Sequence, residues 1–364
     1  MLRLIDRFAG AGCIAILLGF GLVAFYPFYP HPPNDVGWLA NGDGLQFRRG
    51  GIIGPSGAGD DPTRPCSIEI WAQAARGYDG VLVDFFDPRR PNRLTIEQYD
   101  DLSLRVRQSD ASTIRDLWAP PDIGQDRPAL ISVVSDGAQT RLYVDGILAN
   151  ASSELRASMA DCSANFVLGS GASSDATWDG NLLGLAFYDE TLEPAVIDRH
   201  HEAWRTGQGR TLSQAQGRDD PAPVALYLFD ERSGNTVRDH SGAQRNLRIP
   251  ESFEVPLSTF LAWPRWVEIR MNELDWSDIV INVSGFVPFG FFLCAFLRSK
   301  GLVGRRLVAS TLAGGLAVSL AIEIIQFWLP TRTSSSIDVL TNALGAVIGA
   351  LLYVVFQRRS ARTG

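Results

Sequence analysis

Hydrophobic residues are concentrated in four blocks of the chain and are patterned differently everywhere else. The blocks are residues 8–28, 279–297, 307–329 and 337–356. Each is about 20 residues long, the length at which a helix crosses the hydrocarbon core of a bilayer. The pattern therefore predicts four membrane-spanning helices.

Between the first and second blocks, the chain contains short β-type runs separated by turn residues such as Asp-Gly. These runs are 66–74, 80–86, 93–99, 102–108, 129–135, 140–149, 166–170 and 182–192. Short strands at such spacing are typical of an all-β sandwich or jelly roll. The predicted fold is thus multidomain, with an all-β jelly-roll sandwich and an α-helical four-span membrane unit.

This pattern sets the expected domain boundaries. Residues 260–276 mix tryptophans with charges, as in a segment lying at the membrane surface, although an ordinary linker with an aromatic anchor is equally consistent. The expected parts are a first transmembrane helix (1–28), a β-domain (34–256), an interfacial linker (257–277), a three-helix membrane segment (278–358) and a tail (359–364).

The net charge of −7 conceals an asymmetry that indicates orientation. Segments 1–7, 298–306 and 357–364 carry nine basic residues and one acidic residue, whereas the remainder carries 24 basic and 39 acidic residues. Positive segments flanking membrane helices remain in the cytoplasm. We therefore expect both termini to be cytoplasmic and the β-domain to be extracytoplasmic.

The four cysteines fall into two pairs by location. Cys13 and Cys294 lie in hydrophobic blocks, whereas Cys66 and Cys162 lie in the β-domain. An exported domain meets an oxidising environment, which allows a disulfide between Cys66 and Cys162. Two buried free thiols are the alternative.

Six polar residues lie at one depth of the predicted membrane unit, toward the outer ends of the last three helices, and Arg332 lies at the same depth in the connecting outer loop. Within each helix they are three or four positions apart, which places them on one face. Polar groups inside a bilayer are costly, so we expect a shared cluster that serves helix adhesion, binds the headgroup of an amphiphile or moves protons. The residues are Asp278, Asn282, Glu323, Gln326, Arg332, Asp338 and Asn342.

The membrane motifs resemble a known family. The motifs Asp278-x3-Asn282-x2-Gly285-Phe286-x-Pro288-Phe289-Gly290, Glu323-x2-Gln326 and Arg332-x5-Asp338-x3-Asn342-x2-Gly345-x3-Gly349 look like those of the VanZ-like family of small bacterial membrane proteins. The resemblance implies a bacterial inner-membrane location and an association with teicoplanin resistance, through a biochemical activity that is not established. This chain departs from the family in the large insertion after its first helix.

The inserted domain resembles the laminin-G-like and concanavalin A-like jelly rolls. The matching runs are 67–72, 129–137, 140–148, 166–169 and 178–192. Residues 226–242 also look like part of this family, but they close the domain here instead of opening it. This order suggests a permuted strand order or a late addition to the sandwich. The resemblance implies binding of a glycan or another envelope component.

Catalytic and metal-binding roles receive weaker support. Hydrolases of this fold carry a Glu-x-Asp-x-x-Glu strand that is absent here, and the membrane cluster holds no Cys or His, so we assign no catalytic residue. No cofactor is expected apart from calcium. Four acidic residues could ligate Ca²⁺ through oxygen atoms, but turns require such residues as well. They are Asp145, Asp230, Glu231 and Asp239.

These observations favour a membrane-anchored, non-enzymatic envelope protein whose lectin-like domain binds glycan or another envelope component. The alternative is a membrane enzyme or transporter that acts on a lipid-linked cell-envelope precursor, with a role like glycopeptide resistance. The expected partners are the lipid bilayer together with a cell-wall glycan, a lipid-linked precursor or an envelope protein. An acidic exposed domain without a basic, aromatic-lined patch argues against nucleic acid.

Overall fold

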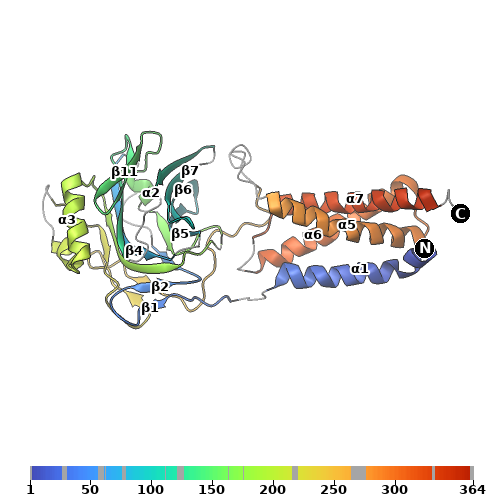
Figure 1. Cartoon of the computed structure of the whole chain (residues 1–364), viewed down its shortest axis with the longest axis horizontal. Coiled ribbons are helices and arrows are strands. Elements are labelled where there is room, and N and C mark those ends of the chain that lie inside the picture. The colour runs from blue at the N-terminus through green and yellow to red at the C-terminus, as the bar shows by residue number, and fades with distance from the viewer. Residues whose placement is uncertain are drawn as a thin grey trace. The chain divides into compact units, whose positions relative to one another are not determined.

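The computed structural model of the chain describes residues 2–26, 31–55, 61, 63–75, 79–110, 112–120, 127–162, 164–174, 176–214, 220–263, 276–329 and 333–360. Two compact units are present, shown in Figure 1. One unit comprises residues 31–257, and the other comprises residues 1–30 with 258–364. The β-rich unit is therefore inserted into the helical unit after its first helix.

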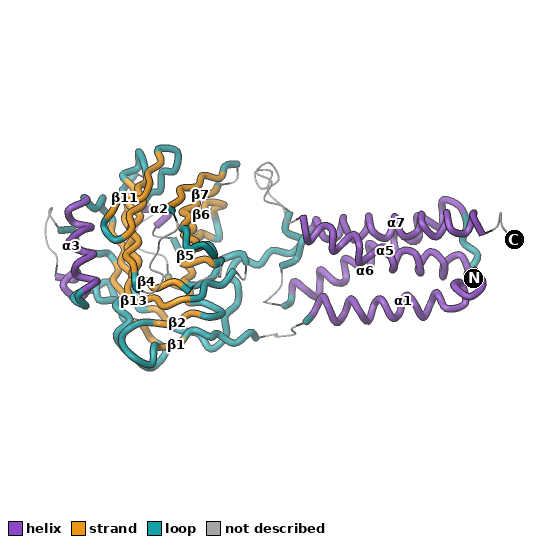
Figure 2. The backbone as a smooth tube through the Cα atoms, viewed as in Figure 1, coloured by secondary structure: helices purple, strands orange, loops and turns teal. Residues whose placement is uncertain are grey.

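Two antiparallel sheets form the β-rich unit (Figure 2). The first sheet has the order β1-β2-β13-β4-β9-β10-β11, with β14 also paired to β13, and the second has the order β3-β12-β5-β6-β7-β8. The strands of the first sheet are β1 (Gly37–Trp38), β2 (Leu45–Phe47), β4 (Cys66–Ala74), β9 (Ala129–Ser135), β10 (Thr140–Val144), β11 (Ile147–Ser152), β13 (Gly180–Tyr188) and β14 (Ala225–Tyr227). Those of the second are β3 (Ile52–Gly54), β5 (Gly80–Asp87), β6 (Arg90–Gln98), β7 (Leu104–Ser109), β8 (Ile114–Ala119) and β12 (Asn165–Leu168).

The core lies between these sheets because alternate residues of each strand point inward. Ile68 and Ile70 of β4 belong to the same buried cluster as Phe85 of β5 and Leu94 and Ile96 of β6. This period of two follows from the strand pleat. The predicted all-β sandwich is confirmed.

One predicted run divides into two strands. Residues 140–149 form two strands, β10 and β11, because Asp145 and Gly146 adopt positive φ angles of 50° and 82° and close a hairpin. An Asp-Gly pair suits the turn that joins two twisted antiparallel strands.

The unusual closing segment completes the first sheet. β2 pairs with Gly180–Leu182 of β13, and β14 pairs with Leu185–Phe187 farther along the same strand. Two short strands from opposite ends of the domain thus follow one another along β13. A small hairpin of β15 (Thr236–Val237) and β16 (Leu247–Arg248) follows β14.

A helical layer covers the other face of the first sheet. Helix α3 (Pro194–Arg205) packs Ile197 and Trp204 into a second buried cluster with Trp71 and Tyr188 of the sheet. Because β4 is covered on both faces, eight of its nine residues are buried, including the polar Ser67 and Glu69. The turn α2 (Met159–Cys162) and the 3₁₀-helix η1 (Gly209–Gln214) complete this unit.

The helical unit holds four helices that are long and apolar enough to cross a membrane. They are α1 (Leu2–Phe25), α5 (Trp276–Ser299), α6 (Gly304–Phe327) and α7 (Ser336–Ser360). At Gly290, Gly345 and Gly349, a Cβ atom would overlap the backbone of the facing helix, so these glycines bring α5 and α7 into close contact. Gly285 is different, because the nearest atom to a Cβ built there is 3.9 Å away, on Phe20.

Candidate functional sites

The most deeply buried carboxylate of the predicted membrane cluster is Glu323. Its side chain is 1% exposed, and Oε2 accepts a hydrogen bond of 2.7 Å from the backbone N–H of Ser335. The hydroxyl of Ser334 also lies close enough to the carboxylate to interact with it. Glu323 of α6 is therefore bound to the connection that leads into α7.

Residues from α5 and α7 join the same end of the helical unit. Asp338 of α7 lies close enough to the side chains of Asn282 of α5 and Ser335 to interact with them, and close enough to Glu323 to interact electrostatically. Asp278 lies near Asp338 but is exposed. Three helices thus contribute to one cluster. Arg332 lies outside the described residues.

Two amide side chains predicted to belong to this cluster have buried oxygen atoms without a hydrogen-bond partner among the described residues. Asn342 is 5% exposed and donates through Nδ2 to Ser319 Oγ at 2.9 Å, while its Oδ1 has no hydrogen-bond partner among the described residues. Gln326 donates through Nε2 to the carbonyl of Ala24 at 3.4 Å, and its buried Oε1 likewise lacks a described partner. An unpaired buried acceptor is costly. The site can therefore receive additional hydrogen-bond donors.

Sequence reasoning missed the serines of this cluster. Ser319 precedes Glu323 by one helical turn, which is the spacing that could have identified it. Ser334 and Ser335 lie in the α6–α7 connection, and no periodic signal marks them.

The segment that precedes α5 contacts the same connection. The backbone of Ala262 exchanges hydrogen bonds with Ser334 and Ser336 at 2.9 and 3.0 Å, and Phe260 packs edge-on against Phe327 with ring centroids 5.5 Å apart. Trp263 and Trp276 are about 60% exposed. Trp266 and the rest of 264–275 lie outside the described residues.

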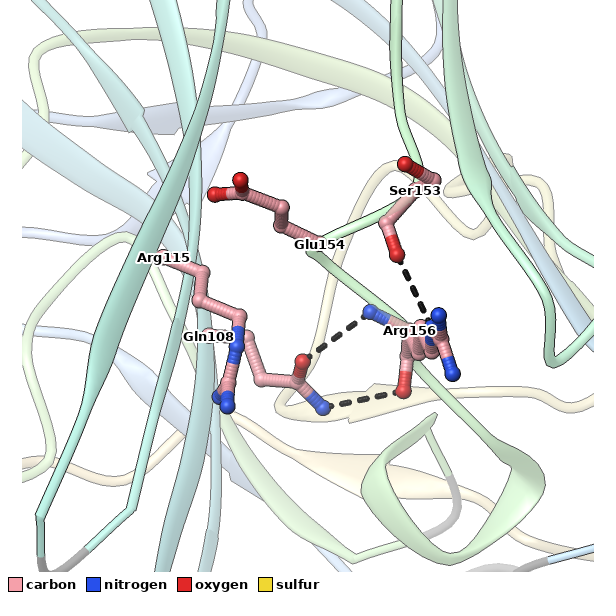
Figure 3. A pocket seen from close by; sticks show the side chains of 5 residues that line it. All are labelled: Gln108, Arg115, Ser153, Glu154 and Arg156. Carbon is pink, nitrogen blue, oxygen red and sulfur yellow. Dashed lines mark hydrogen bonds between the residues drawn. The ribbon is translucent and has the colours of Figure 1, made fainter.

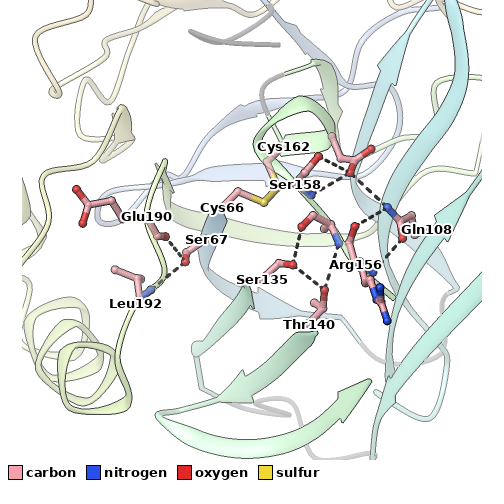
Figure 4. Close-up of a disulfide and its surroundings, with 12 residues drawn as sticks. Cys66, Ser67, Gln108, Ser135, Thr140, Arg156, Ser158, Cys162, Glu190 and Leu192 are labelled. Carbon is pink, nitrogen blue, oxygen red and sulfur yellow. Dashed lines mark hydrogen bonds between the residues drawn. A yellow bond between two sulfur atoms is a disulfide. The ribbon is translucent and has the colours of Figure 1, made fainter. Parts of the chain in front are cut away.

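A disulfide joins Cys66 of β4 to Cys162 of α2 (Figure 4). The two Cα atoms are 6.5 Å apart, a separation that a disulfide spans. Nearby, Ser135 Oγ donates to the carbonyl of Ala157 at 2.6 Å, and the N–H of Ala157 donates to Thr140 Oγ1 at 3.3 Å. These bonds attach the segment before α2 firmly to the first sheet.

That segment forms one wall of a cavity of about 520 Å³, which we call the arginine pocket. Its lining residues are Gln108 of β7, Arg115 of β8, and Ser153, Glu154 and Arg156 of the loop after β11 (Figure 3). Gln108 holds this loop in place, because its side-chain amide accepts from the N–H of Arg156 and donates to its carbonyl, both at 3.1 Å. A second cavity of about 280 Å³ shares Gln108 and Arg156. The sequence held no motif for this pocket, because its walls come from separate strands.

Two buried acidic residues of the β-domain, Asp84 and Glu69, have structural partners. Asp84 bonds Arg93 and the backbone N–H of Ala172. Glu69 is fully buried beneath α3, where its carboxylate lies 3.0 Å from His200 Nδ1. Glu69 and Asp84 also belong to different sheets.

The buried Glu69 network was not foreseen. The hydroxyl of Tyr188 lies 3.2 Å from Glu69 and the indole N–H of Trp204 lies 3.4 Å from it, while His200 Nε2 lies 2.9 Å from Asp220. Burial alone would lower the pKa of His200, but the hydrogen bonds and charges of Glu69 and Asp220 outweigh burial and raise that pKa above 6.5. The network joins α3 to the sheet.

The predicted calcium ligands separate into different environments. Asp239 accepts backbone hydrogen bonds from Leu226, Ser241 and Arg245, as a turn residue does, and Asp145 accepts from the N–H of Leu130 at 2.9 Å. The remaining two residues, Asp230 and Glu231, lie together.

Asp230 and Glu231 are grouped with His240, and ligand atoms of the three residues lie within 4.8 Å of one another. Glu231 Oε2 and His240 Nε2 are buried without hydrogen-bond partners among the described residues. Among the residues that the structure describes, these three side chains form the group that could hold a cation, although the guanidinium of Arg210 already bonds Asp230.

Comparison with known proteins identifies relatives for the membrane part. Residues 224–357 match the VanZ/LLP1 family model. Protein VanZ of Enterococcus faecium is 32% identical over 79 residues, which are 22% of this chain and 45% of that protein. The match therefore spans about half the length of this relative.

The β-domain has separate relatives. Residues 51–198 match the model of the concanavalin A-like lectin/glucanases superfamily. A candidate carbohydrate-binding protein of Bacteroides ovatus is 9% identical, with a TM-score of 0.38 and coverage of 60% of this chain and 58% of that one. Domains LG4-5 of the mouse laminin α1 chain are 10% identical, with a TM-score of 0.36 and coverage of 47% and 48%.

These TM-scores mark distant likeness, so the fold assignment relies on the sheet topology and the family model. Both resemblances inferred from the motifs are confirmed. The chain combines a membrane segment that matches the VanZ-like family with a β-domain that matches the concanavalin A-like lectin/glucanase superfamily.

Proposed function

We propose that this membrane protein displays its β-domain outside the bacterial cytoplasmic membrane, where the domain binds a glycan of the cell envelope. The arginine pocket carries this proposal, because its lining combines amide, hydroxyl, carboxylate and guanidinium groups on a fixed loop. Hydroxyl-rich ligands need such convergent polar groups. The disulfide is consistent with an oxidising location.

A binding assay with a pocket-filling variant tests the glycan proposal. The full chain, purified in detergent, is applied to an array of bacterial envelope saccharides. Ser153→Trp places a large side chain at the pocket and should abolish binding, whereas Ala138→Trp, in the exposed β9–β10 turn, should preserve it. Absence of glycan binding by the unmodified chain, or equal binding by both variants, would refute the proposal.

Orientation is tested by labelling. The nine basic residues in the segments beside the helices predict that these segments are cytoplasmic. In spheroplasts, Ala138→Cys should react with a membrane-impermeant maleimide, and Leu302→Cys should react only after permeabilisation. The unmodified chain measures any background from Cys13 and Cys294, which are buried. The opposite labelling pattern would contradict the proposed topology.

A second function is proposed for the helical unit, which would act on a lipid-linked envelope precursor. Glu323 and Asp338 supply carboxylates, and the unsatisfied Oδ1 of Asn342 supplies a further acceptor. Together these acceptors could bind an amine or the sugar hydroxyls of a lipid headgroup. The alternative of helix adhesion uses the same hydrogen bonds but needs no ionisable group.

Glu323→Gln separates these two roles. The amide keeps an acceptor for Ser335 but loses the ionisable group, so the headgroup function predicts lost activity in a protein that still inserts and folds. Activity is measured as teicoplanin tolerance in a complemented deletion strain, and folding as the melting temperature in detergent. Thr311→Val is the control, since Thr311 is buried in the same helix and its hydroxyl bonds the carbonyl of Leu307 and interacts with the thiol of Cys294. Wild-type tolerance with Glu323→Gln would support adhesion alone.

A further inference from the structure

The residues that line the arginine pocket carry two guanidinium groups and one carboxylate. Arg115 and Arg156 line the pocket with a single carboxylate, that of Glu154. Glu154 is exposed, and Figure 3 shows its carboxylate directed away from Arg156. The residues that line the pocket therefore carry a net positive charge.

Arg115 has only a weak ionic partner. Its closest carboxylate, Asp110, is 3.4 Å away. Asp110 already accepts hydrogen bonds from the backbone N–H groups of Ser112 and Thr113, at 2.7 and 2.9 Å, and from both hydroxyls. These bonds, that of the Thr113 hydroxyl foremost, hold the pKa of Asp110 well below its usual value. The carboxylate of Asp110 therefore mainly stabilises the turn at Ser112 and Thr113. Most of the N–H donors of Arg115 remain available to a ligand.

The guanidinium of Arg156 is also available to a ligand, and hydrogen bonds hold the backbone of this residue in place. Its Nε donates to the carbonyl of Ser153 at 2.8 Å, and no carboxylate of the described residues forms an ion pair with it. Gln108 holds its backbone on both sides, and the neighbouring Ala157 is bonded to Ser135 and Thr140. A fixed backbone reduces the entropy lost when the side chain binds a ligand.

We propose that the arginine pocket recognises a saccharide bearing one carboxylate, with Arg115 and Arg156 binding the acid group. This inference rests on the proposed glycan-binding function and specifies its ligand class. Guanidinium groups match the planar geometry of a carboxylate through paired N–H donors. Ser153 and Glu154 can bond ring hydroxyls, and Glu154 disfavours a second acid group nearby. A volume of about 520 Å³ accommodates one or two sugar rings.

Two disaccharides that differ in one acid group test the proposal. The full chain, reconstituted in phosphatidylcholine nanodiscs, is titrated with N-acetylglucosaminyl-N-acetylmuramic acid and with chitobiose, which lacks the lactyl carboxylate. We expect the acidic disaccharide to bind at least about tenfold more tightly, because hydrogen bonds between charged groups exceed neutral ones by this order. Raising the salt concentration should reduce the preference.

Variants then assign the preference to the two arginines. Arg115→Gln and Arg156→Gln should each reduce it, and the double variant should abolish it while chitobiose binding persists. Arg48→Gln, at an exposed position after β2, should leave the preference unchanged. Equal affinity for the two disaccharides, or a preference that survives in the double variant, would overturn the carboxylate assignment but leave glycan binding intact. Binding of neither disaccharide, with no ligand on the wider array, would overturn the proposed function too.

Discussion

Replacing His200 with leucine is expected to lower the free energy of unfolding of the β-domain by about 3 kcal/mol, because it leaves a buried carboxylate without its cationic partner. Glu69 is fully buried, and His200 is 2% exposed. Tyr188 and Trp204 would remain as donors to Glu69, but neither can supply a positive charge. The loss should appear as a lower transition midpoint in denaturant unfolding of the full chain, followed by tryptophan fluorescence.

Two further variants isolate the cause. His201→Leu changes the adjacent residue, whose Nε2 lies 3.4 Å from Asp145 and whose side chain is 23% exposed, and it should cost less than about 1 kcal/mol. Adding Glu69→Gln to His200→Leu should recover much of the loss, because a neutral amide needs no cation and still accepts hydrogen bonds. An unchanged midpoint for His200→Leu would show that the network does not join α3 to the sheet.

The same network gives the domain a defined pH dependence. The pKa of His200 is raised above its ordinary value of 6.5 in the folded chain. Its contribution to stability is therefore fully present below about pH 6.5 and is lost as the pH rises through the higher folded-state pKa. We expect the wild-type melting temperature to fall over this alkaline window, and His200→Leu should remove that fall.

Removing the disulfide is expected to cost about 4 kcal/mol, since it cross-links residues 96 positions apart and thereby restricts the unfolded chain. The double variant Cys66→Ala, Cys162→Ala should unfold at lower denaturant concentration than wild type. It should also bind glycan more weakly, because α2 directly follows the loop that carries Arg156.

Reduction provides an independent measurement of the same effect. Dithiothreitol should destabilise the wild type to the level of the double variant and leave the double variant unchanged. The membrane cysteines control for other thiol effects, because Cys13→Ala, Cys294→Ala should retain the full response to dithiothreitol. A wild type that resists denaturant equally well after complete reduction would contradict this prediction.

Much of the fold was predictable because it follows from local periodicity. Four long apolar blocks can satisfy their backbone hydrogen bonds in a membrane only as helices, and β4, β5, β9 and β12 fall where short apolar runs predicted strands. The very short strands β2 and β14 carried no such signal. Each has only three residues, and it forms a strand only because it pairs with the otherwise unpaired edge of β13.

The candidate sites show the same division. Polar residues inside the hydrophobic blocks were identifiable from the cost of burying them, and the structure brings Asn282, Glu323 and Asp338 into one cluster. The arginine pocket could not be found this way. Arg115 and Arg156 are ordinary charged residues in the sequence, and only the tertiary structure places both of them at one cavity.

The sequence by itself determined the two kinds of architecture, the four apolar helices long enough to cross a membrane and the two family resemblances, since each depends on residue type at short, regular spacing. Tertiary structure decided which distant residues meet. It placed Glu69 under His200, which is 131 positions away, attached Cys162 to Cys66, and set Gln108 against the backbone of Arg156. The physical reason is that such contacts depend on strand order and sheet packing, and no local pattern of hydrophobic and polar residues specifies these.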